Sequence, residues 1–187
     1  MSIGIQYLID PTLTSITEQI LKEDQTIDIY IHNLEGKAWV FGGPFGSQHI
    51  NTESWYASDI DFTLSLVGEL DNRLGINFDL TKDKFNSDIA IYLDKEIYID
   101  DNNTLGLAVS NYTEEQGYFW EILLDRSDFG SSDYFRYGLI HEIAHTLGME
   151  HPFSAHDGDV FAGNTDAWSS TYPHETVMSY RAPLNGA

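Results

Sequence analysis

Apolar residues recur along this chain with two different periods, one typical of helices and one typical of strands. A spacing of three or four residues places apolar side chains on one side of a helix, whereas alternation places them on one face of a strand. Residues 35–57, which are rich in Gly, Ser and aromatic residues, indicate a loop or hairpin. The predicted helices are 11–23, 59–74 and 134–147, and the predicted strands are 26–32, 76–80, 89–93, 105–109 and 119–124.

The second and third predicted helices each carry a regular apolar stripe. Gly75 follows the second helix as a stop signal. Gly130 ends the segment before the third helix, and Ser131, Ser132 or Asp133 is a suitable N-cap. Each stripe predicts one buried helical face, and the two stripes comprise Phe62, Leu66, Leu70 and Leu74, and Phe135, Leu139, Ile143 and Leu147.

The third predicted helix contains the most informative motif of the chain, H-E-x-x-H-x-x-G-x-x-H, which begins at His141. His145 lies four residues later, so both histidines project from one face of the helix, with Glu142 beside them. Gly148 suits the left-handed residue that ends a helix, and the turn there brings His151 back from the far side. This spacing can hold one zinc ion and activate one water molecule.

Three neutral imidazoles leave the fourth position of a tetrahedral zinc ion open, which is the catalytic rather than the structural arrangement. Glu142 is placed to reach a water molecule on the metal rather than the metal itself, so it is the expected general base. The alternative is a helix with two exposed histidines and a third one near its end. The presence of both Gly148 and His151 favours the metal site.

The composition is that of a globular protein, with 187 residues, 42% of them hydrophobic and 13% aromatic. This length suits one domain with a substantial core. We expect residues 26–187 to form that domain and residues 1–25 to be an N-terminal extension. The chain contains no cysteine, which excludes a disulfide scaffold, a thiolate zinc site and a cysteine nucleophile.

The charge is strongly acidic, with a formal net charge of −21. This charge argues against a nucleic-acid partner and against binding to an anionic membrane surface. It suits a soluble extracellular protein, although a solvated acidic surface alone also explains it. No apolar run approaches the length of a membrane span, and the first ten residues have no signal-peptide pattern.

A second segment, residues 176–180, reads Thr-Val-Met-Ser-Tyr. Together with the histidine motif and Pro152, it resembles the metzincin clan of zinc peptidases, and in detail the bacterial serralysin family. The resemblance implies that Met178 lies in a tight turn beneath the metal, as an apolar floor. It also implies that Tyr180 is an additional zinc ligand that swings away to hydrogen-bond the oxyanion. From the residues alone, Met178 is equally well a core residue and Tyr180 an ordinary half-buried aromatic.

The resemblance also implies the fold and the substrate. The order of predicted elements is that of the serralysin catalytic domain, so we expect an α+β fold. This fold has a twisted, mostly parallel sheet of about five strands on two long helices, with a small lower subdomain carrying the Met-turn. A protein or peptide substrate is expected to lie extended in the cleft and to pair with an edge strand. Our candidate for that strand is 105–109.

Two departures from the family pattern bear on the extent of the chain. The sequence ends shortly after Met178, where the family continues into another helix, and it lacks the glycine- and aspartate-rich calcium-binding repeats. It is therefore expected to be a fragment of a longer protein or an atypical short member. The resemblance further implies a secreted bacterial protein, exported without an N-terminal signal, and we expect a monomer.

Two other groups near the motif have weaker signals. His156, Asp157 and Asp159 follow the third histidine, and the two aspartates offer the hard oxygen ligands that Ca²⁺ prefers. A solvated loop is the alternative, and the sequence favours it. His174 is expected at the rim of the cleft rather than on the metal, because a catalytic zinc ion needs only three protein imidazoles.

The leading hypothesis is thus a secreted zinc-dependent endopeptidase. An alternative from another class is a non-catalytic, metzincin-like module that keeps zinc for stability or binding. The intact Glu142 favours the enzyme, because zinc binding alone does not need it. A zinc hydrolase acting on something other than peptides is a third and weaker alternative.

Overall fold

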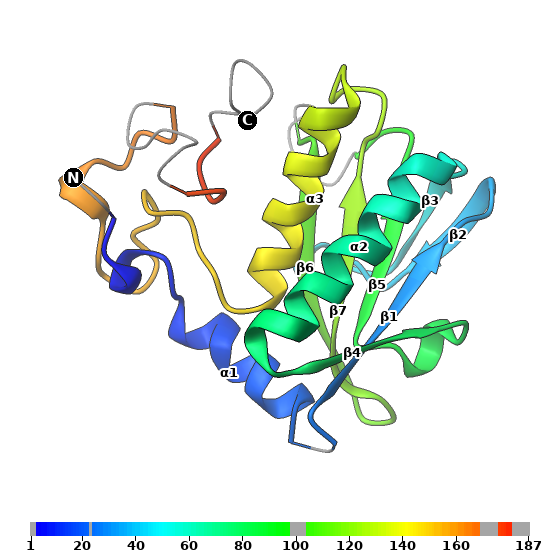
Figure 1. The fold of residues 1–187 in the computed structure, drawn as a ribbon, viewed down its shortest axis with the longest axis horizontal. Helices are drawn as coiled ribbons and strands as arrows, with labels where there is room; N and C mark the ends of the chain where they lie inside the picture. The colour runs from blue at the N-terminus through cyan, green and yellow to red at the C-terminus, as the bar shows by residue number, and fades with distance from the viewer. Residues whose placement is uncertain (1–2, 23, 98–103, 169–175, 181–187) are drawn as a thin grey trace.

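The computed structural model describes residues 3–22, 24–97, 104–168 and 176–180. Figure 1 shows the helices gathered on one side of a twisted sheet, with the β2–β3 hairpin at the opposite end from α1. Among the described residues, no helix combines the length and the apolar character needed to cross a bilayer. The helices are α1 Pro11–Ile20, α2 Ala57–Leu74 and α3 Ser132–Thr146. The strands are β1 Thr26–His32, β2 Gly36–Val40, β3 Gln48–Thr52, β4 Asn77–Thr81, β5 Ile89–Leu93, β6 Gly106–Thr113 and β7 Gly117–Leu124.

The main sheet has five strands in the order β4-β1-β5-β7-β6. The first three pairings are parallel, and β6 alone runs antiparallel to its neighbour β7. The predicted α+β architecture, with a mostly parallel five-stranded sheet, is therefore confirmed. Strands β2 and β3 form a separate antiparallel hairpin, as the loop or hairpin prediction for residues 35–57 allowed.

Central strand β5 is buried along its whole length and divides its side chains between two apolar clusters. Successive residues of a strand point to opposite faces. Ile89, Ile91 and Leu93 pack on the helix side, whereas Ala90 and Tyr92 pack beneath the β2–β3 hairpin. Burial on both faces explains why this strand appears in the sequence as a continuous apolar run rather than an alternating one.

Strand β6 confirms the prediction of an edge strand beside the motif helix, but it is longer than expected. It pairs with β7 from Gly106 to Thr113, where the sequence predicted only residues 105–109. The additional residues, Ser-Asn-Tyr-Thr, are mostly polar, so hydrophobicity does not mark them as strand. Their backbone pairing with β7 sustains the strand instead. Helix α3 packs against this end of the sheet.

The N-terminal segment packs against the rest of the protein. Ile16 and Ile20 of α1 belong to the main core. Leu8 packs with Met178 and Ala144, and Ile9 forms a bridge with Met149. Residues that the sequence predicted to be an extension thus contact the segment that leads to the third motif histidine.

The buried face of α2 differs from the predicted stripe. Its deepest positions are Asp59, Thr63 and Val67. The predicted residues Phe62, Leu66 and Leu70 lie half-buried beside them, and Leu74 is 48% exposed. One of the deepest positions holds a carboxylate with cationic partners, so charge pairing as well as apolar spacing contributes to which side of the helix is buried.

Those partners are two arginines. Asp59 is fully buried, and its carboxylate lies 3.0 Å from Nε of Arg126 and 3.7 Å from Nε of Arg136. Asp59→Ala would leave both guanidinium groups without this buried counter-charge. We expect it to lower the free energy of unfolding in urea by about 2–3 kcal/mol. Asp61→Ala, on the exposed side of the same helix, serves as the control, and equal losses in the two variants would contradict the role of the ion pair.

Candidate metal centre

Helix α3 begins as the sequence predicts. Gly130 adopts a left-handed conformation with φ of +69°, and the Ser131 side chain accepts a hydrogen bond from the Tyr134 amide at 3.2 Å. Phe135, Leu139 and Ile143 are buried against the sheet. This stripe fixes the rotation of the helix and turns the opposite face, which bears His141 and His145, towards the site.

The turn after α3 brings the third histidine to the other two. Gly148 has a φ of +95°, and a Cβ atom there would lie 2.6 Å from Oγ1 of Thr14 in α1. Its carbonyl accepts a hydrogen bond from the Asp10 amide. A side chain at position 148 would therefore be strained and would push α1 away. Both constraints explain the glycine of the motif and the direction in which His151 approaches.

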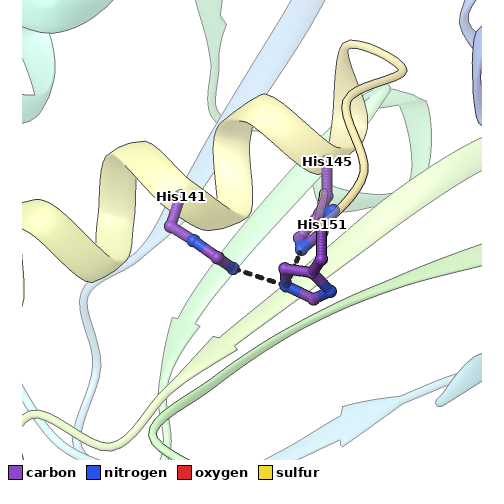
Figure 2. Close-up of side chains that lie close together, drawn as sticks. All are labelled: His141, His145 and His151. Carbon is purple, nitrogen blue, oxygen red and sulfur yellow. Dashed lines mark hydrogen bonds between the residues drawn. The ribbon is translucent and has the colours of Figure 1, made fainter. Parts of the chain in front are cut away.

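The three motif histidines converge on one point, as Figure 2 shows. Nε2 of His151 lies 2.9 Å from Nε2 of His141 and 3.2 Å from Nε2 of His145. Two nitrogen ligands of a tetrahedral zinc ion lie about 3.3 Å apart, since each Zn–N bond is about 2.0–2.1 Å. The observed spacing is close to this value, so these residues could hold a metal ion.

Backbone carbonyls orient two of the three imidazoles. Nδ1 of His141 lies 2.8 Å from the Val177 carbonyl, and Nδ1 of His145 lies 2.8 Å from the Met149 carbonyl. A carbonyl only accepts, so each Nδ1 carries the proton and each Nε2 presents a lone pair. His151 can donate to at most one of the two facing lone pairs. This donor set could hold a shared cation, and its chemistry fits zinc.

Burial keeps the three imidazoles in the neutral form that a metal requires. Burial lowers the pKa of His145 to about 4, and the nearby His141 contributes to this shift. Burial and the two other imidazoles lower the pKa of His151 to about 2. The pKa of His141 is also lowered by burial, against the opposing effect of its hydrogen bond to Val177. All three are therefore neutral at neutral pH.

Glu142 lies beside the histidines and is 6% exposed. Burial raises the pKa of its carboxyl group to about 8, and the backbone of Ala108 in β6 opposes this shift. A Cβ atom on Gly106 would lie 2.6 Å from Oε1 of Glu142, so the first residue of β6 has to be small for the carboxylate to occupy this place. The edge strand therefore positions Glu142, a role that its sequence did not reveal.

Residues 176–180 close the site from the other side. Met178 is fully buried against Ala144, which lies in α3 between the two helical histidines. The Tyr180 ring lies 4.8 Å from the ring of His151 and 6.1 Å from that of His141, between centroids. The structure thus brings Met178 and Tyr180 to the histidines, although they are distant in sequence.

A cavity of about 590 Å³ joins these groups to the edge strand. The three histidines, Glu142 and Tyr180 all line it. Its other walls come from the start of β6, from α3 and from three aromatic residues elsewhere. The complete lining is Leu13, Thr104, Leu105, Gly106, Leu107, Ala108, Trp120, Phe129, Tyr134, Tyr137, Gly138, His141, Glu142, His145, His151, Trp168, Ser179 and Tyr180.

Sequence reasoning missed several wall residues that the motif itself could have identified. Tyr134 and Tyr137 precede His141 by seven and four residues, so they share its helical face. Tyr137 also donates a hydrogen bond to the Ser179 carbonyl at 2.8 Å and thereby ties the helix to the Tyr180 segment. His174, which we expected at the rim of the cleft, lies outside the described residues.

No protein-family model matches this chain, and no curated protein is significantly similar to it in sequence. The functional argument therefore depends on the residues of the site itself.

Proposed function

We propose that this protein is a zinc-dependent endopeptidase that hydrolyses extended polypeptides. One observation carries the proposal, namely the convergence of three imidazole Nε2 atoms beside a buried carboxylate in a cavity bounded by an edge strand. A site that only stabilised the fold would need neither the carboxylate nor the cavity. His141, His145 and His151 would hold the metal.

Zinc, when bound, supplies an acidified water molecule and a Lewis acid for the scissile carbonyl. Glu142 adds a base that lies within the same cavity and is fixed there by Gly106 and Ala108. A zinc cation would favour the ionised form of Glu142 and so offset the effect of burial on its pKa. The carboxylate would then accept the proton of the attacking water and later deliver it to the leaving amine.

The substrate would bind as an additional strand along β6. This strand is the last in the sheet, and its first residues form a wall of the cavity next to Glu142. An extended peptide can hydrogen-bond to the backbone of an edge strand whatever its side chains are. Such pairing would place a scissile bond beside the histidines and would favour unfolded or flexible segments as substrates.

Tyr180 would donate a hydrogen bond to the oxyanion, as the resemblance to serralysins implies. We expect Tyr180→Phe to lower kcat by about 10²-fold with little change in KM, because this bond forms only in the transition state. Steady-state kinetics on a fluorogenic peptide measure the two constants separately. Tyr56→Phe, at a tyrosine that is 62% exposed, is the matched control. An unchanged kcat in Tyr180→Phe would exclude the oxyanion role.

Hydrolysis of unfolded casein, with the metal content of the same sample determined, tests the function as a whole. One zinc ion per chain together with cleavage supports the proposal. Full zinc occupancy without cleavage of any unfolded substrate would contradict it and would favour a non-catalytic zinc module. Cleavage that survives complete removal of the metal would also contradict it.

Membership of the serralysin-like metzincins forms part of the same proposal. It is supported by the motif and by the position of Met178 beneath the histidine pair, next to Ala144. A secreted bacterial protein is the setting that this resemblance implies.

A further inference from the structure

A second group of possible metal ligands lies in and next to the loop that follows the third histidine. Single carboxylate oxygens of Glu150, Asp157 and Asp159 all lie within 4.8 Å of one another. Two oxygens bound to one Ca²⁺ ion at about 2.3–2.6 Å lie at most about 5 Å apart. The three side chains are therefore close enough to share one ion without rearrangement of the backbone.

Glu150 supplies an independent indication of a ligand. It is 4% exposed, and both of its carboxylate oxygens are buried without a hydrogen-bond donor. The Ser154 hydroxyl lies nearby and favours the charged form, but it makes no hydrogen bond to either oxygen. Buried carboxylates in proteins are almost always hydrogen-bonded, paired with a cation or coordinated to a metal. This one instead faces two further carboxylates.

Among the residues that the structure describes, no ion pair joins a cationic side chain to Glu150, Asp157 or Asp159. His156 precedes Asp157 directly, and its Nδ1 lies 3.4 Å from the Asp10 carboxylate. Asp10 therefore adds another negative charge to the neighbourhood, and it acts electrostatically on Glu150 together with Asp157 and Asp159. A divalent cation would supply the positive charge that these carboxylates lack.

We propose that Glu150, Asp157 and Asp159 form a calcium site. The ligands are all oxygens, which Ca²⁺ prefers, whereas zinc prefers nitrogen and sulfur. Asp157 is exposed and Asp159 is half-buried, so water molecules can reach the site and complete a coordination shell of six to eight. Mg²⁺ needs near-ideal octahedral geometry at shorter distances and is usually bound by only one or two carboxylates, so it suits a site of three carboxylates less well.

The position of Glu150 indicates what the ion would do. The Glu150 amide donates a hydrogen bond to the Leu8 carbonyl, and the next residue is His151. An ion shared with Asp157 and Asp159 would fasten the loop to Glu150 and, through its hydrogen bond to Leu8, to the N-terminal segment. The site stands apart from the proposed hydrolysis, because its ligands do not line the catalytic cavity.

Calcium binding by the intact, zinc-loaded chain is the test, with CaCl₂ titrated in a calorimeter. We expect one ion per chain with a Kd on the order of 10⁻⁴ to 10⁻³ M, and binding to Mg²⁺ at least about tenfold weaker. The double variant Asp157→Asn/Asp159→Asn should weaken Ca²⁺ binding at least about tenfold. Asp61→Asn/Asp79→Asn, which removes the same charge at exposed positions elsewhere, should bind as the parent does.

A second variant protects the test against misfolding. Glu150→Gln keeps the shape of the buried side chain and should also weaken Ca²⁺ binding at least tenfold while one zinc ion stays bound. Absence of saturable Ca²⁺ binding to the parent chain would overturn the site, and so would equal binding by the parent and the Asp157/Asp159 double variant. Equal affinity for Mg²⁺ would overturn the assignment to calcium. Because every readout is binding, failure here is distinct from failure to cleave casein.

Discussion

Glu142→Gln is expected to lower kcat about 10²- to 10⁴-fold while one zinc ion stays bound to each chain. Glutamine matches the size of glutamate, so the close contact with Gly106 is preserved. An amide cannot take the proton of the attacking water, whereas the three histidines remain unchanged. The measurement pairs peptide hydrolysis with metal analysis of the same sample.

Glu114→Gln, at an exposed position in the turn between β6 and β7, is the control and should behave like the parent chain. Full activity in Glu142→Gln would remove the general-base role. Loss of zinc in Glu142→Gln would point instead to a structural role for the carboxylate.

His145→Ala is expected to abolish both zinc binding and hydrolysis. It removes one of three Nε2 donors and leaves the Met149 carbonyl without its imidazole partner. The parent chain should melt at a higher temperature when zinc is added, by an amount equivalent to about 4 kcal/mol at a thousandfold excess over Kd. The variant should show no such shift, and thermal melts with and without zinc measure this difference.

The control for this variant is His49→Ala, at an exposed histidine of the β2–β3 hairpin. It should retain zinc, the melting shift and hydrolysis. Stoichiometric zinc in His145→Ala would show that other residues hold the metal, and the assignment of the three-histidine site would then be wrong.

Local patterns predicted most of the architecture because they depend on nearby residues only. The start of α3 follows from Ser131 and Gly130, and its buried face follows from the spacing of Phe135, Leu139 and Ile143. The convergence of two histidines follows from four-residue spacing in the same helix. These features need no information from the rest of the fold.

Features that depend on contacts between residues far apart in sequence could not be predicted from local patterns. Helix α2 buries Asp59, and the carboxylate of Asp59 pairs with Arg126, a residue far along the chain. Gly106 matters because β6 approaches Glu142, and nothing near residue 106 reveals this approach. The positions expected for Met178 and Tyr180 came from family resemblance rather than from their own surroundings.

Glu150 is the clearest example of a residue whose surroundings could not be predicted from local sequence. A glutamate next to the motif's last histidine appears in the sequence as an ordinary solvated residue. It is buried where its backbone amide pairs with the Leu8 carbonyl, and carboxylate oxygens of Asp157 and Asp159 lie close to its own. The sequence offered Asp157 and Asp159 as an alternative to a solvated loop, which it favoured, but the buried carboxylate beside them emerges only from the fold.

The first and last described segments of the chain are in contact at the candidate metal centre, where Leu8 packs with Met178 and Ala144. Contacts between residues so far apart in sequence have the highest loop-closure cost and form late in folding. Helix α3 can form early and already carries two of the histidines. We expect the third histidine, Met178 and the Val177 carbonyl to reach the site only after both ends of the described chain have packed together. The substrates that we propose for this chain are extended polypeptides, and the chain itself is extended before it folds. Late assembly of the centre would keep newly made copies from digesting one another during that interval.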